Sequence, residues 1–107
     1  MEKETFSMVI TTCGSKSDAE EIATALLAQQ LAACIQVFPI TSYYTWKGEQ
    51  AIDDEQVLFI KSKSDLYPQI EGAIRQHHKY EVPEIIQVPI TNGLPAYLSW
   101  INEVSAK

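Results

Sequence analysis

Cys34 and His78 carry donor atoms that copper and zinc prefer, a thiol and an imidazole. A thiolate selects these metals when a second soft or imidazole donor lies nearby. Cys34 and His78 are therefore candidate ligands for copper or zinc, and no obligatory cofactor is expected. The alternative for Cys34 is a small side chain packed inside a strand, a common role of free cysteine.

The second histidine, His77, precedes His78 at the end of a predicted helix. About 100° separates consecutive side chains around a helix axis, so one helix cannot direct both imidazoles at a single ion with good geometry. His77 falls at the centre of the apolar side of this helix, where a packed imidazole is expected, and His78 falls at its border. Either ring can also interact with the C-terminal end of the helix dipole.

Charged residues suggest two other kinds of binding. A run of acidic residues could bind a hard cation, and one lysine could bind an anion. Asp53, Asp54 and Glu55 are consecutive, but a calcium-binding loop alternates its oxygen ligands around a glycine, so we expect a solvated strand edge here. Lys61 ends an apolar strand, and its ammonium needs solvent or an anionic partner. Glu84 is the candidate partner, in an ordinary ion pair or as part of a ligand site.

The remaining sequence patterns limit the classes of function. Cys13 and Cys34 are far apart and form no C-x-x-C motif, so we expect neither a disulfide scaffold nor a structural zinc site, and we expect reduced thiols in a cytosolic protein. Cys13, beside Gly14 at a strand end, is expected to be exposed. The sequence has no nucleophile with a matching base, no glycine-rich phosphate loop and no metalloprotease spacing, so we predict a binding protein rather than an enzyme.

Acidic residues outnumber basic ones by 14 to 8, which gives a formal net charge of −6. That charge opposes binding to nucleic acids and to anionic membrane surfaces, and it suits cations. Residues 1–5 include acids where a secretory leader needs basic residues, and no apolar run reaches the roughly 20 residues that span a bilayer, so we expect neither a leader nor membrane insertion. The 107 residues fit one domain, spanning 1–107.

Hydrophobic periodicity predicts the elements that position these side chains. Alternation over residues 6–11 is typical of a half-buried strand, which should end near Gly14. The spacing of Ser17 and Glu20 then predicts a capping box at the start of a helix. The apolar side of this helix comprises Ala19, Ile22, Ala23, Leu26, Leu27 and Leu31.

A long hairpin is predicted in the middle of the chain. Residues 33–46 are rich in β-formers, 47–48 supply a turn, and the apolar run at 57–60 predicts a buried strand. An arm of about fourteen residues reaches about 46 Å when straight, whereas a compact domain of this size is roughly 35 Å across. We therefore expect the hairpin to bend at Pro39 and its tip to project and pair with another subunit.

A second helix, a last strand and a terminal helix follow the hairpin. Ser64 and Asp65 are candidate caps of the second helix, which is expected to end near His78. Residues 85–90 form the last apolar strand, and Pro95 suits the first position of the terminal helix. The side chains of that helix expected to face inward are Tyr97, Leu98, Ile101 and Val104.

This order of elements is typical of an α+β fold of the split βαβ, ferredoxin-like type, βαββαβ with a C-terminal helix added. Such a fold has an antiparallel sheet with both main helices on one face. The other face would be an exposed apolar patch, so its simplest cover is another subunit.

Four ordered segments resemble the CutA family of divalent-cation tolerance proteins, and the likeness extends over nearly the whole chain. They are Leu31–Cys34, Ser42–Gly48, Glu55–Lys61 and His78–Ile86, and Tyr97–Trp100 also resembles the family pattern. The resemblance implies a ferredoxin-like subunit in a tight homotrimer, similar in architecture to the PII signal proteins, with hairpins that exchange sheet contacts between neighbours. It further implies an inter-subunit cleft that gathers Cys34, Tyr44, Trp46, Glu55, Lys61, His78, Tyr80 and Glu84.

One departure from the family pattern is Lys79, which stands where the family usually has proline, so His78 is expected to approach the cleft differently. The leading hypothesis is a cytosolic trimer that acts in divalent-metal tolerance and engages copper through Cys34 and His78. The alternative is a PII-like signalling or scaffolding trimer that binds a small anion through Lys61 and Tyr80 and docks an unidentified partner protein.

Overall fold

The computed structural model describes residues 4–105 of the chain. Its elements, in chain order, are β1 (Phe6–Cys13), α1 (Lys16–Ala28), β2 (Cys34–Trp46), β3 (Glu49–Lys63), a 3₁₀ turn (Ser64–Leu66), α2 (Tyr67–His77), β4 (Ile85–Ile90) and α3 (Pro95–Val104). The order of strands and helices is the predicted one, and α3 begins at Pro95 as expected.

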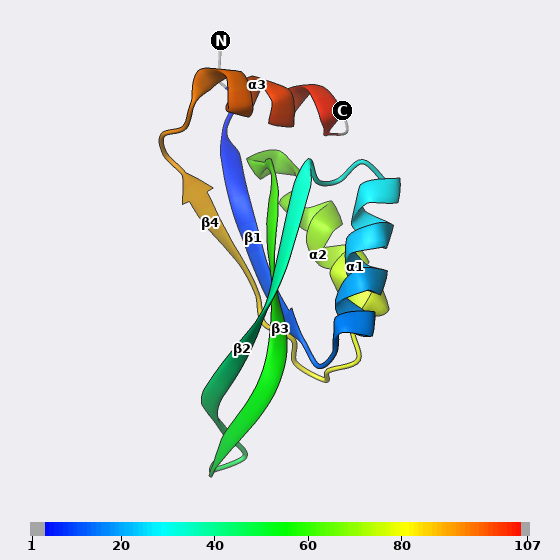
Figure 1. Cartoon of the computed structure of the whole chain (residues 1–107), viewed down its shortest axis with the longest axis vertical. Coiled ribbons are helices and arrows are strands. Elements are labelled where there is room, and N and C mark those ends of the chain that lie inside the picture. The colour runs from blue at the N-terminus through cyan, green and yellow to red at the C-terminus, as the bar shows by residue number, and fades with distance from the viewer. Residues whose placement is uncertain (1–3, 106–107) are drawn as a thin grey trace.

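The four strands form one antiparallel sheet in the order β2-β3-β1-β4. Figure 1 shows α1 and α2 on one face of this sheet, while α3 crosses the end that lies away from the tip of the hairpin. Each half of the chain thus places its helix on the same side of the sheet. This is the ferredoxin-like arrangement, and it confirms the predicted fold class.

The core lies between the sheet and the two helices. Alternate residues of β1 point toward the helices, and Val9 and Cys13 are buried there. Leu58 and Ile60 of β3 lie beside this strand and are fully buried. The helices contribute Ala19, Ile22, Leu26, Ile70, Ala73 and Ile74 to the same cluster. Burial of this apolar surface is the main favourable term that holds the helices on the sheet.

The first helix begins earlier than predicted. Its N-cap is Ser15, which has extended backbone geometry and whose hydroxyl accepts a hydrogen bond from the Asp18 amide at 3.0 Å. Ser17 already lies inside the helix, so the predicted capping box of Ser17 and Glu20 is wrong. The reason is that β1 ends at Cys13, and the first side chain after the turn that can cap the helix is Ser15.

The second helix has no side-chain cap at its start. A 3₁₀ turn leads into it, and the Ser64 hydroxyl lies 2.6 Å from the Ser7 hydroxyl on β1. The predicted cap at Ser64 and Asp65 is therefore wrong, because a tertiary contact with β1 takes the serine hydroxyl. The helix ends at His77 as expected, and His78 has extended backbone geometry.

Three side chains that the helical pattern predicts to face inward are exposed. Leu27 of α1 is 48% exposed, and Tyr97 and Val104 of α3 are exposed as well. On α3 the fully buried side chain is Ile101, since this helix crosses the end of the sheet instead of lying along its face. The helices therefore bury a narrower arc than the sequence pattern indicates.

The hairpin of β2 and β3 projects from the body of the subunit, as predicted. β1 pairs with residues 56–63 of β3, so residues 49–55 pair with β2 alone. The pairing of β2 with β3 continues without a bulge through Pro39, and Lys47 and Gly48 take positive φ angles at the tip. The longest dimension of the molecule is 49 Å as a result (Figure 1).

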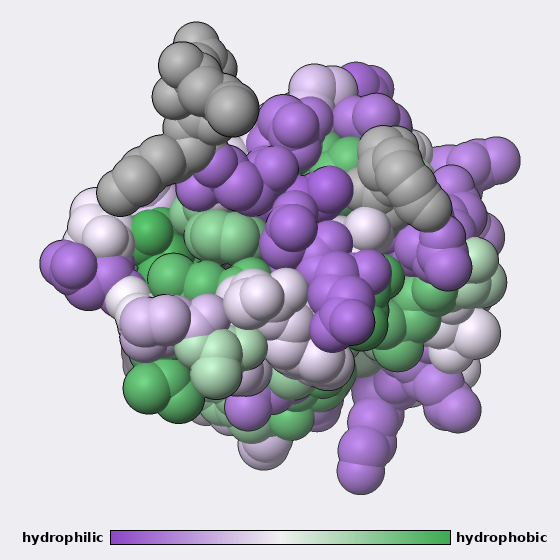
Figure 2. All heavy atoms as spheres, turned by 90° about the horizontal axis from the view of Figure 1, so that it is seen from above, coloured by the Kyte–Doolittle hydropathy of each residue, from purple (hydrophilic) through white to green (hydrophobic). Residues whose placement is uncertain are grey.

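The sheet face opposite α1 and α2 keeps apolar side chains exposed, and we call it the open face. Phe38 packs edge-on against Phe59 at a ring-centroid distance of 5.0 Å, yet Phe38 is 41% exposed. Ile86 and Val88 of β4 share this face and are also exposed. Seen from the α3 end, hydrophobic areas lie among hydrophilic side chains (Figure 2).

Within residues 4–105, no helix is both long and apolar enough to cross a membrane.

Candidate functional site

A groove lies where the projecting part of the hairpin meets the segment 78–84, which precedes β4. Its volume is about 580 Å³. The lining residues are Thr12, Ser42, Tyr43, Tyr44, Trp46, Asp53, Glu55, Tyr80, Glu81, Val82 and Glu84. Four of them are aromatic, four carry carboxylates, and none is a lysine or arginine. The groove therefore combines aromatic rings with negative charge.

One tyrosine–carboxylate pair joins the two sides of the groove. The Tyr80 hydroxyl donates to Oε2 of Glu55 at 2.7 Å, and Glu55 is only 8% exposed. Burial and then the bond to Glu55 raise the pKa of Tyr80 far above its usual range, so this phenol stays protonated at neutral pH. The prediction of a solvated acidic edge is wrong for Glu55, because Tyr80 packs against it from the segment 78–84.

A second tyrosine–carboxylate pair lies on the hairpin itself. The Tyr44 hydroxyl donates to Oδ2 of Asp53, its diagonal neighbour across the two strands. This bond is the main cause that raises the pKa of Tyr44, so its phenol also stays neutral. Alternation along the strands places Asp53 on the same face as Glu55, and it brings Tyr44 and Trp46 to that face as well.

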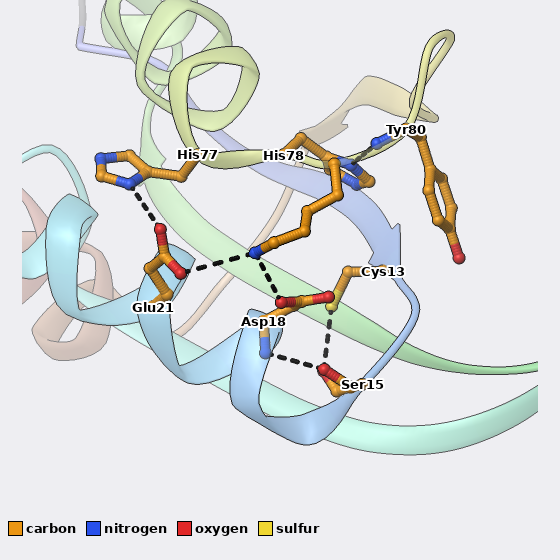
Figure 3. A network of polar contacts seen from close by, with 8 residues as sticks. Cys13, Ser15, Asp18, Glu21, His77, His78 and Tyr80 are labelled. Carbon is orange, nitrogen blue, oxygen red and sulfur yellow. Dashed lines mark hydrogen bonds and ion pairs between the residues drawn. The ribbon is translucent and has the colours of Figure 1, made fainter.

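The imidazole of His78 fixes the segment 78–84 to the end of β1. Its Nε2 lies 2.6 Å from the Thr12 carbonyl oxygen. Its Nδ1 accepts a hydrogen bond from the Tyr80 amide at 3.1 Å (Figure 3). Since a carbonyl only accepts, the ring carries its proton on Nε2. The ring also packs on the Tyr80 ring, with centroids 4.7 Å apart. Both ring nitrogens are therefore engaged by the protein itself.

Lys79, the residue that departs from the CutA pattern, joins the same segment to α1. Its Nζ lies 2.9 Å from Oδ1 of Asp18 and 3.8 Å from Oε1 of Glu21. The other carboxylate oxygen of Glu21 lies 3.1 Å from Nδ1 of His77, which completes one polar network (Figure 3). The hydrogen bond with Lys79 lowers the pKa of Asp18, and it raises the pKa of Lys79. The network anchors the segment that carries Tyr80.

Cys34 and Lys61 lie on the open face, outside the groove. They are opposite each other on β2 and β3, and Cys34 is half-buried with a free thiol. The Lys61 ammonium donates to Oε1 of Gln36 at 2.8 Å and lies 5.8 Å from the centre of the Tyr97 ring. The predicted partner of Lys61, Glu84, lines the groove instead, so the predicted pairing of the two is wrong within the subunit.

The two candidate metal ligands do not meet within one subunit. Cys34 is opposite Lys61, whereas the Thr12 carbonyl that binds His78 is opposite Val57, four residues away on β3. That separation is about 13 Å along the strand. In the part of the chain that the structure describes, no three histidine, cysteine or acidic side chains are grouped so that they could hold a metal ion.

The structure brings together five of the eight residues predicted for the cleft, namely Tyr44, Trp46, Glu55, Tyr80 and Glu84. It adds Tyr43, Asp53 and Glu81, which the sequence did not assign to the cleft. The sequence could have indicated Asp53, because residues two apart on a strand share a face and Asp53 is two residues from Glu55. Glu81 lies in an irregular segment, where no periodicity indicates the direction of a side chain.

Cys13 is buried, contrary to the prediction of an exposed thiol. It is 1% exposed because alternation along β1 points its side chain toward the helices. Its Sγ donates a weak hydrogen bond to the Ser15 carbonyl at 3.5 Å, and burial raises the pKa of the thiol. Cys13 is therefore a packing residue rather than a reactive thiol.

Relatives of known family match this chain along nearly its whole length. Residues 7–104 match the family model of the CutA1 divalent ion tolerance protein. The chain is 38% identical over 97 residues to the divalent-cation tolerance protein CutA of Thermus thermophilus, a match that covers 90% of this chain and 94% of that protein. It is 41% identical over 100 residues to protein CutA of Mus musculus, a match that covers 92% of this chain. The chain spans about half the length of this mouse relative, with 56% of it covered.

Solved structures of the same family also superimpose on nearly the whole chain. CutA1 from the psychrotrophic bacterium Shewanella sp. SIB1 superimposes with a TM-score of 0.93 at 37% identity, covering 99% of this chain and 100% of that chain. CutA1 from Oryza sativa superimposes with a TM-score of 0.93 at 31% identity, covering 96% of this chain and 95% of that chain. By sequence and by structure, the chain belongs to the CutA1 divalent ion tolerance protein family.

Proposed function

We propose that this protein acts in divalent-cation tolerance by binding a divalent metal ion, with Cu(II) as the expected species. Membership of the divalent ion tolerance family is the observation that carries the proposal. The net charge of −6 and the carboxylates of the groove support it, since both attract cations.

The thiol of Cys34 is the proposed first ligand. It is free and half-buried on the open face of the subunit, and a thiolate is a strong donor for copper. His78 is the proposed second ligand, and it becomes available when its bond to the Thr12 carbonyl opens. Because the two side chains are apart within a subunit, a shared site requires them to come from neighbouring subunits.

The proposed assembly is a homotrimer. Residues 40–46 and 49–55 of the hairpin have no third strand in the subunit, and an isolated two-stranded hairpin is only marginally stable in water. Tyr43 and Ile52 on this hairpin are 75% and 63% exposed. A neighbour that pairs with the hairpin and covers the open face would supply the missing contacts.

Native mass spectrometry of metal-free protein titrated with Cu(II) tests the assembly and the metal together. We expect a mass of about 36 kDa, three times the subunit mass of 12.0 kDa, that takes up whole numbers of copper ions. Cys34→Ala and His78→Ala are expected to lose copper affinity, while the neighbouring His77→Ala keeps it. Unchanged affinity in both ligand variants would contradict the site, and a monomeric mass would contradict the assembly.

A PII-like signalling or scaffolding role, with a small anion in the cleft, is the weaker proposal. Lys61 does not line the groove, and the charged side chains that do line it are carboxylates, which repel an anion. A metabolite anion that raises the melting temperature of the wild-type protein but not of Lys61→Ala would favour this role.

The expected compartment is the cytosol, on the basis of the two free thiols. Relatives from Archaeoglobus fulgidus and Arabidopsis thaliana are named as periplasmic and chloroplastic proteins, respectively. Cell fractionation with detection of this chain distinguishes these locations.

A further inference from the structure

We propose that Lys79 controls the release of the His78 imidazole from the end of β1. The ammonium of Lys79 lies 2.9 Å from Oδ1 of Asp18 and 3.8 Å from Oε1 of Glu21, and we call these two ion pairs the latch. The proposal rests on the proposed metal function, because coordination by His78 requires the release of its ring. The release itself is measurable in the protein without metal.

His78 and Lys79 are adjacent in the chain, but their side chains contact different elements. The His78 ring lies 2.6 Å from a carbonyl oxygen at the end of β1, whereas the Lys79 side chain reaches the first turn of α1 (Figure 3). Glu21 also contacts His77, whose Nδ1 lies 3.1 Å from its Oε2. The start of the segment 78–84 is therefore held by β1 through one residue and by α1 through the next.

The His78 ring has two routes away from β1. Rotation of the ring alone breaks its bond to the β1 carbonyl, its bond from the Tyr80 amide and its packing on the Tyr80 ring. Movement of the backbone at residues 78–80 breaks only the first of these contacts, because the ring and the amide then move together. That movement pulls the Lys79 ammonium away from both carboxylates. The latch therefore opposes the route that loses the fewest other contacts.

The latch lies within one subunit and on the side of the molecule away from the proposed contacts between subunits. Asp18 and Glu21 belong to α1, which packs on the sheet face opposite the open face (Figure 1). The proposed neighbour covers the open face and the hairpin. Both ion pairs join residues of a single chain, so the inference depends on contacts that the subunit makes and not on an uncovered surface.

The exposure of the latch sets the size of its effect. The Lys79 side chain is 61% exposed, and those of Asp18 and Glu21 are 22% and 50% exposed. Water and salt therefore screen both ion pairs. Ion pairs of this kind shift an equilibrium by about 1.5-fold to fivefold. A shift of that size adjusts the population of released rings and makes it sensitive to salt.

NMR spectroscopy of the metal-free protein with isotope-labelled histidine, in its native assembly and at constant pH, tests the latch. The Nε2 proton of His78 is donated to the β1 carbonyl, so its exchange with water reports the release of the ring. Lys79→Met removes the charge and is expected to speed this exchange by about 1.5-fold to fivefold at low salt. Lys79→Arg keeps the charge and is expected to restore the wild-type rate. Asp18→Asn removes the nearer partner and is expected to speed the exchange as well.

Two controls separate the latch from a general effect of charge. Lys16→Met removes the same charge from the exposed first residue of α1, which has no ion pair within residues 4–105, and it is expected to leave the rate unchanged. An increase of NaCl from about 0.01 M to about 1 M shortens the Debye length from about 30 Å to about 3 Å. This increase is expected to speed the exchange in the wild-type protein but not in Lys79→Met.

Copper affinity relates the latch to the proposed metal function. With His78 as a ligand, Lys79→Met is expected to bind Cu(II) more tightly by the same factor at low salt, because a larger fraction of the rings is available. Faster proton exchange with unchanged copper affinity would support the latch and contradict His78 as a ligand. An exchange rate in Lys79→Met that is equal to or below the wild-type rate, or an equal change in Lys16→Met, would overturn the latch itself. The two failures are therefore distinguishable.

Discussion

The bond between Tyr80 and Glu55 joins two elements that are not adjacent in sequence, and it has both a structural and a functional consequence. Glu55 is almost completely buried, and a buried carboxylate without a donor would lose much of its hydration free energy. The Tyr80 hydroxyl offsets that loss. In doing so it holds the segment 78–84 against the hairpin, which creates the second side of the groove.

Removal of this hydroxyl is the sharpest test at the residue scale. Tyr80→Phe is expected to lower the free energy of unfolding by about 1–2 kcal/mol, because a charged acceptor loses its donor while the ring packing is kept. Urea denaturation at a fixed protein concentration measures the change. Tyr43→Phe is the matched control, and this exposed residue is expected to change the value by less than about 0.5 kcal/mol. Equal losses in the two variants would contradict the role of the Tyr80–Glu55 bond.

At the scale of elements, the segment 78–84 has no regular structure, so side chains at its start fix its position. His78 binds the Thr12 carbonyl at the end of β1, and Lys79 pairs with Asp18 in the first turn of α1. Both contacts converge on the turn between β1 and α1. The position of the groove therefore depends on how α1 begins.

The cap of α1 provides the prediction at this scale. Ser15→Ala is expected to lower the free energy of unfolding by about 1 kcal/mol, because the Asp18 amide loses its acceptor. Ser17→Ala, inside the helix and exposed, is expected to be neutral within about 0.5 kcal/mol. Thermal or urea unfolding of both variants compares them directly. A larger loss in Ser17→Ala would support the capping box that the sequence suggested and contradict the structure.

Over the whole molecule, several groups hold their protons more tightly in the folded state than in the unfolded state. The pKa of Cys13 is raised above 9.0 by burial, that of Tyr80 above 10.0 by burial and by Glu55, and that of Lys79 above 10.5 by Asp18. For a group with a raised pKa, the stabilisation is complete below the unfolded-state pKa and is lost as pH rises through the folded-state pKa. All three shifts therefore act in the same direction.

We accordingly expect the melting temperature to fall progressively as pH rises above about 9, where unfolded thiols begin to ionise. Circular dichroism melts between about pH 7 and pH 11 at constant ionic strength measure this fall. In Tyr80→Phe the fall above about pH 10 is expected to be shallower, since one of the titrating groups is gone. A melting temperature that stays constant over this range would contradict the shared direction of the shifts.

The sequence by itself determined the order of the elements, the ferredoxin-like fold class and the projection of the hairpin. These features depend on local information. A period of two in β1, a helical period in α1 and α2, and the turn at Lys47 and Gly48 are each set by neighbouring residues. The projection followed from the length of β2 and β3 compared with the size of a domain of this length.

Only the tertiary structure decided which side chains form the groove and which are withdrawn from it. Glu55 was expected in water, yet it is buried because Tyr80 reaches it from a segment far along the chain. Ser64 was expected to cap a helix, yet its hydroxyl contacts Ser7 on another strand. The position of such a contact depends on strand register and on packing between distant segments, and the local pattern of residue types carries neither.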